Sequence, residues 1–166
     1  MARPSFIRNV HELAAEPGVY PGDTEVLSTG TPLSRPLGLT RLGIHHELLP
    51  PGTRTSWPHA EELEEEFIYV LEGHPHVWLN GELEALKPGD CVAFVPGTGI
   101  AHTFLNNSDQ PVRLIVVGER MPESRIFYPF HPKGFEGLKP ELVWPDVPRH
   151  PLGPHDGKPN PVKAEP

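Results

Sequence analysis

The sequence predicts an all-β fold, an antiparallel sandwich or barrel, with irregular proline-rich extensions at both ends. About eight or nine short apolar segments recur between residues 38 and 120, and turn residues separate them. The chain has 23 prolines and 16 glycines, which favours many short elements over long helices. Its 166 residues fit one domain with a substantial core.

The first segment, residues 1–37, is interrupted by five prolines and predicts an irregular extension across the sheet surface. Asn9 and Glu12 have the spacing of a capping box, so we expect one short helix over residues 9–15. The first long strand is expected over residues 39–49. His45 and His46 are adjacent on it and face opposite sides, so either one of them points into the barrel or they form a cross-strand polar pair.

The remaining strands follow at regular spacing. A strong hairpin signal, Asn80-Gly81, separates two of them. The single cysteine, Cys91, lies in an apolar run, so we expect a buried and inert thiol. The predicted strands cover residues 66–72, 76–79, 83–86, 91–95, 100–105 and 112–118.

Three parts are therefore expected: an N-terminal extension over residues 1–37, a barrel over 38–120 and a C-terminal extension over 121–166. The C-terminal part holds many prolines but also large apolar residues such as Tyr128 and Trp144, unlike a disordered tail. We expect residues 122–153 to pack on the barrel or on a partner subunit, which predicts a homodimer, and residues 157–166 to fray.

Composition limits the partners. The formal net charge of −8 argues against nucleic acid and anionic membranes. No apolar run approaches the ~20 residues of a membrane span, and the N-terminal residues lack the features of a secretory signal. One cysteine fits a reducing compartment, so a cytoplasmic protein is expected.

The chemistry is expected in the stretch SWPHAEELEEEFIYVLEG, residues 56–73, where five carboxylates precede an apolar run. Adjacent like charges repel, and a bound cation is the simplest compensator. His59 and Glu61 are two apart and share a strand face, while Glu66 begins the next strand. If pairing brings His102 alongside, then His59, Glu61, Glu66 and His102 form a metal site. The alternative is an acidic hairpin that binds no metal.

These two stretches resemble the two signature motifs of the cupin superfamily. In the first motif, His59-Ala60-Glu61 corresponds to H-x-H with the second histidine replaced, and Glu66 to Gly73 matches E-x6-G. In the second, Gly99 to His102 keeps G-x2-H and His102 to Asn106 keeps H-x3-N. In each motif the spacing from the leading glycine is one residue longer than usual. The turn PGTGIAHTF is similar to that of small single-domain bacterial cupins of unassigned function.

The resemblance implies a double-stranded β-helix, the cupin jelly-roll barrel, often dimeric, with one divalent metal near the barrel mouth. By position, His59, Glu66 and His102 would be ligands. If Glu61 also binds, two glutamates and two histidines favour Mn or Fe over Zn, with Ni also possible. If Glu61 turns away, the remaining set resembles the facial triad of non-haem iron oxygenases, and Glu61 becomes a candidate general base.

The function expected is that of a metal-binding cupin acting on a small molecule, by oxygenase, isomerase or lyase chemistry. The alternative is a non-catalytic cupin that binds or senses a small ligand. A regulator attached to a DNA-binding domain is disfavoured, because residues 1–37 leave no room for a helix-turn-helix.

Overall fold

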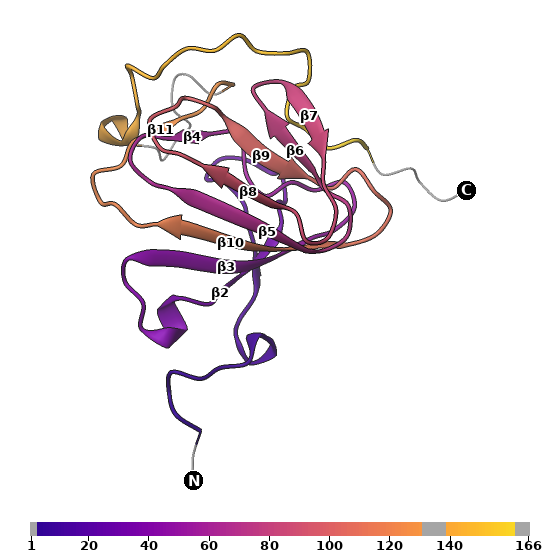
Figure 1. Cartoon of the computed structure of the whole chain (residues 1–166), viewed down its shortest axis with the longest axis vertical. Coiled ribbons are helices and arrows are strands. Elements are labelled where there is room, and N and C mark those ends of the chain that lie inside the picture. The colour runs from indigo at the N-terminus through magenta and orange to yellow at the C-terminus, as the bar shows by residue number, and fades with distance from the viewer. Residues whose placement is uncertain (1–2, 131–138, 162–166) are drawn as a thin grey trace.

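The computed structural model describes residues 3–130 and 139–161, and these form a nearly all-β, antiparallel jelly roll (Figure 1). The larger sheet has the strand order β1-β2-β3-β10-β5-β8, and a three-stranded sheet has the order β7-β6-β9. A short pair, β11-β4, completes the described strands. Their bounds are β1 Glu16–Pro17, β2 Thr29–Pro32, β3 Leu42–Leu49, β4 Ala60–Glu61, β5 Glu66–Glu72, β6 His76–Leu79, β7 Glu82–Ala85, β8 Cys91–Phe94, β9 His102–Leu105, β10 Val112–Glu119 and β11 Ile126–Phe127.

The main core lies between the two larger sheets. Strand β10 is central, since it pairs with β3 on one side and β5 on the other. The buried cluster joins Leu49, Ile68, Val70, Val112 and Leu114 of the six-stranded sheet to Val77 and Phe104 of the three-stranded sheet. Burial of these side chains holds the sheets face to face.

Side chains of strand β5 alternate between the two faces of the sheet. Ile68 and Val70 are buried, while Phe67, Tyr69 and Leu71 are exposed on the outer face. Cys91 pairs with Tyr69 and shares this outer face. The expected buried thiol is therefore wrong: Cys91 is exposed, because strand alternation turns it away from the core.

The hairpin at Asn80-Gly81 is confirmed. Both residues have positive φ, 45° and 98°, as the tight turn between β6 and β7 requires.

The N-terminal residues are more ordered than expected. Asn9 and Glu12 form the capping box, but the helix is a single 3-10 turn, η1 (Val10–Glu12). Residues 16–17 and 29–32 then add two strands to the edge of the large sheet. A second 3-10 turn, η2, spans Arg35–Leu37.

The described C-terminal residues lie against the barrel. Strand β11 pairs with β4, and a 3-10 turn, η3 (Pro140–Leu142), precedes Trp144. Trp144 and Val147 are buried in a second cluster with Trp78 and Leu105. The prediction that residues 157–166 fray is wrong at residue 157, because Gly157 is buried and its carbonyl accepts a hydrogen bond from Arg54. Residues 162–166 lie outside the described part. Within the residues that the structure describes, no helix is long and apolar enough to cross a membrane.

Candidate metal centre

Backbone pairing places two histidines side by side. His59, just before β4, forms an antiparallel bridge with His102, the first residue of β9. The His59 amide donates to the His102 carbonyl at 3.1 Å, and the His102 amide donates to the His59 carbonyl at 2.8 Å. These bonds fix both Cα positions, so the two rings project from a rigid frame.

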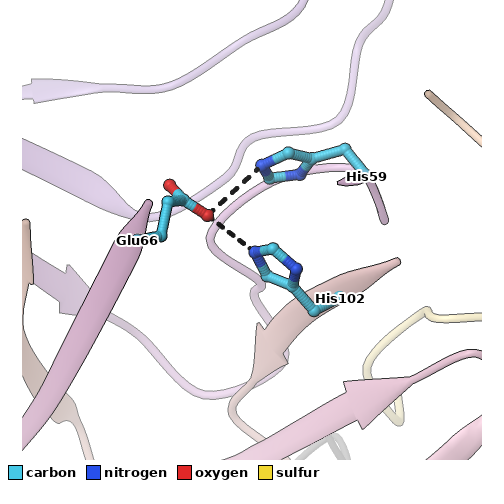
Figure 2. A group of neighbouring side chains, drawn as sticks. All are labelled: His59, Glu66 and His102. Carbon is cyan, nitrogen blue, oxygen red and sulfur yellow. Dashed lines mark hydrogen bonds and ion pairs between the residues drawn. The ribbon is translucent and has the colours of Figure 1, made fainter. Parts of the chain in front are cut away.

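The two rings converge on Glu66, the first residue of β5 (Figure 2). Glu66 Oε2 lies 2.7 Å from His102 Nε2 and 3.8 Å from His59 Nε2. One ligand atom from each residue lies within 4.8 Å of the others. Two imidazole nitrogens and one carboxylate oxygen at this spacing fit a divalent transition metal ion.

Contacts behind the rings orient them. His59 Nδ1 lies 2.8 Å from the Trp57 carbonyl oxygen, so this nitrogen donates and Nε2 faces Glu66. Phe94 stacks on His102 with ring centroids 3.4 Å apart. A hydrogen bond from the distal ring nitrogen is the usual support of a metal-binding histidine.

The electrostatics keep Glu66 ionised. Burial alone would raise the pKa of Glu66, but the hydrogen bond with His102 and the attraction of His59 and His102 outweigh burial and lower the pKa to about 2. The carboxylate is therefore an anionic donor at neutral pH.

Glu61 lies beside this group. Its Oε1 is 4.0 Å from His59 Nε2, and Ser124 Oγ donates to its Oε2 at 3.4 Å. Burial raises the pKa of Glu61 to about 7, and the nearby carboxylates of Glu66 and Glu64 act in the same direction. The three residues whose ligand atoms converge are thus His59, Glu66 and His102, with Glu61 at their edge.

A cavity of about 120 Å³ adjoins the three residues. Its remaining lining has an apolar side and a polar side. His45 lies on the same face of β3 as Glu47 but lines a neighbouring cavity; strand alternation from His45 would also have pointed to Glu47. The apolar lining is Ile68, Phe104 and Val116, and the polar lining is Glu47, Thr55 and Ser56.

Comparison with known proteins gives one family. The family model described as a cupin domain matches residues 45–118. A search of the curated proteins finds no match.

Three solved structures illustrate the similarity. A sugar phosphate isomerase of the cupin superfamily from Silicibacter pomeroyi is 29% identical, with a TM-score of 0.67 over 72% of this chain and 79% of that chain. A candidate sugar phosphate isomerase from Acidithiobacillus ferrooxidans is 25% identical, with a TM-score of 0.70 over 76% and 82%. The polyketide cyclase RemF from Streptomyces resistomycificus is 26% identical, with a TM-score of 0.61 over 86% and 96%.

Proposed function

Because residues 45–118 form a cupin domain and the chain belongs to the cupin superfamily, we propose that it is a metal-dependent enzyme acting on a small molecule. One divalent ion would be held by His59, Glu66 and His102. The observation that carries this proposal is the convergence of their three ligand atoms within 4.8 Å, beside a cavity. Mn or Fe suits two imidazoles with one or two carboxylates, and Ni or Zn remains compatible.

Of the three reaction classes that the sequence suggests, we propose isomerase-type chemistry. Two of the similar structures are described as sugar phosphate isomerases, one of them a candidate. A bound divalent ion would supply Lewis-acid polarisation of a carbonyl group. Glu61 would take a proton from the hydroxyl-bearing carbon next to the carbonyl and return it to the former carbonyl carbon. The hydroxyl proton would pass to the former carbonyl oxygen, so no oxidant or other co-reactant is needed. Oxygenase chemistry would need a second reactant, and lyase chemistry would break a bond to carbon.

Proton exchange tests this proposal. The Mn-loaded protein is incubated with dihydroxyacetone or glyceraldehyde in deuterated water, and carbon-bound deuterium is followed by NMR. We expect exchange that depends on the metal. Absence of exchange from both compounds with a loaded protein would contradict isomerase chemistry and favour the non-catalytic binding module.

The Glu61→Gln variant then separates the two roles of this residue. Loss of exchange with full metal content would identify an acid–base residue. Loss of metal together with exchange would identify a ligand.

We also propose a homodimer. The outer face of the large sheet exposes Phe67, Tyr69 and Leu71, and Val95 is 65% exposed at its edge. Exposed apolar groups on neighbouring strands are typical of an interface between subunits. Sedimentation equilibrium should give a dimer for the wild type and a monomer for Phe67→Asp; a monomeric wild type would contradict the proposal.

A further inference from the structure

A second carboxylate of the cavity, Glu47, has no part in the metal group. It lies on β3 opposite Leu114 of β10, on the strand face that also carries buried Leu49. Its side chain is only 14% exposed. Gly30 makes room for it, because a Cβ at that position would lie 2.8 Å from Glu47 Oε1.

The protein compensates little of the negative charge of Glu47. Ser28 Oγ donates to Glu47 Oε2 at 2.7 Å. Glu47 also pairs with His45, whose Nδ1 lies 3.8 Å from Oε1. Burial lowers the pKa of His45, and the charges of Arg120 and Arg35 lower it further, so this imidazole is neutral at pH 7. Burying a carboxylate with one hydrogen-bond donor is costly, and such groups are concentrated at functional sites.

The Glu47 carboxylate lines two neighbouring cavities. It lines the cavity beside the metal group, and with Thr55 it also lines a neighbouring cavity of about 350 Å³. That second cavity is walled by N-terminal residues, including Glu16 and Gly30. A ligand in the inner cavity would therefore have the metal group on one wall and Glu47 on another.

The charges around both cavities disfavour an anionic ligand. No lysine or arginine of the described residues lines either cavity. Arg54 precedes Thr55, but it is buried, pairs with Glu25 and donates to the Gly157 carbonyl. Glu47 and Glu66 together balance one divalent ion, so a phosphate group would bring uncompensated charge into a confined site.

We propose that Glu47 is the ligand-binding carboxylate of this pocket. It accepts a hydrogen bond from a hydroxyl group of an uncharged hydroxy-carbonyl compound whose carbonyl end reaches His59, Glu66 and His102. The inference rests on the proposed function and deepens it: the substrate is unphosphorylated, unlike the sugar phosphates after which two of the similar proteins are named. Ile68, Phe104 and Val116 would contact its carbon atoms.

Cobalt spectroscopy tests the inference without an activity assay. The protein is loaded with Co(II), and its visible absorption is followed on titration with dihydroxyacetone and, separately, with dihydroxyacetone phosphate. We expect dihydroxyacetone to change the spectrum at about tenfold lower concentration than its phosphate. In Glu47→Gln, dihydroxyacetone should bind about tenfold more weakly at unchanged cobalt content, the effect of losing a hydrogen bond to a charged group. Glu84→Gln, on exposed β7, is the matched control.

The outcomes separate this inference from the proposed function. A wild-type protein that bound no cobalt would defeat the metal site and the inference with it. If cobalt bound but the phosphate were preferred, or neither compound changed the spectrum, only the ligand class would be wrong. Unaltered binding in a folded Glu47→Gln would likewise remove Glu47 from the pocket's chemistry. The two wild-type titrations decide the ligand class even if that variant does not fold.

Discussion

Two partly buried carboxylates of the barrel interior, Glu66 and Glu47, have opposite electrostatic surroundings. Glu66 accepts a hydrogen bond from His102, and with His59 nearby its pKa is lowered to about 2 despite burial. Burial raises the pKa of Glu47, and the hydrogen bond from Ser28 opposes this only in part. The protein stabilises the charged form of Glu66. The charged form of Glu47 is destabilised by burial and would gain from a further hydrogen-bond donor.

The raised pKa of Glu47 predicts a pH-dependent loss of stability. The unfolded chain loses this proton near its ordinary pKa of 4.5, while the folded protein retains it to higher pH. The free energy of unfolding should therefore fall as pH rises from about 4.5 through the raised folded pKa. In Glu47→Gln this contribution is absent, so the variant should gain stability relative to the wild type across that window.

Urea unfolding of metal-free protein between pH 4 and 8 measures this difference. The points at pH 4 serve as an internal control, because Glu47 is then mostly protonated in both states. A difference that stayed constant with pH would contradict the buried, weakly compensated carboxylate.

At the scale of single residues, the sequence predicted the site residues that belong to a motif and missed those that do not. His59, Glu66 and His102 could be found because their spacing resembles a family pattern. Strand alternation from His45 places Glu47 on the inward face, but its partners Ser28 and Gly30 could not be foreseen, because they come from a segment expected to be irregular. Cys91 was misjudged because an apolar run alone does not say which strand face is buried.

At the scale of elements, the turn between β6 and β7 also contacts the C-terminal part of the chain. Gly81 has φ 98°, and a Cβ there would lie 2.3 Å from the Gly153 amide nitrogen. The Gly153 amide in turn donates to the Asn80 carbonyl at 2.7 Å. The C-terminal chain therefore passes directly over this turn, as the yellow segment near β6 and β7 shows (Figure 1).

Alanine substitution at two matched glycines tests this contact. Gly89 has a similar φ of 95°, but no atom of the described residues would lie within 4 Å of a Cβ at that position. Gly89→Ala should therefore cost only the left-handed strain, about 1–2 kcal/mol. Gly81→Ala should cost clearly more, because the C-terminal chain must also move. Thermal or urea unfolding gives both values, and equal losses would argue against the close approach.

At the scale of the whole molecule, the C-terminal residues contribute to the hydrophobic core. Trp144 is 5% exposed and packs with Ala60, Trp78 and Leu105. The expected boundary near residue 120 therefore marks a change in composition, while packing continues across it. Sequence alone could show that this proline-rich part was too apolar for a disordered tail, but not which barrel residues it covers.

Substitution of Trp144 tests this contribution. Trp144→Ala should lower the free energy of unfolding by about 3–5 kcal/mol, the range for removal of a large buried aromatic side chain. Leu152→Ala is the control in the same extension, since Leu152 is 46% exposed and should have a small effect. Equal and small losses for both variants would mean that the C-terminal residues are not part of the core.

The central claim is a divalent metal on His59, Glu66 and His102. The most direct measurement is the metal content of protein purified without chelator or affinity tag, for the wild type beside Glu66→Ala, His102→Ala and Glu84→Ala. We predict about one equivalent of Mn, Fe, Ni or Zn in the wild type and in Glu84→Ala, with loss in the other two variants. No stoichiometric metal in the wild type, even after reconstitution, or full retention in Glu66→Ala and His102→Ala, would contradict the claim.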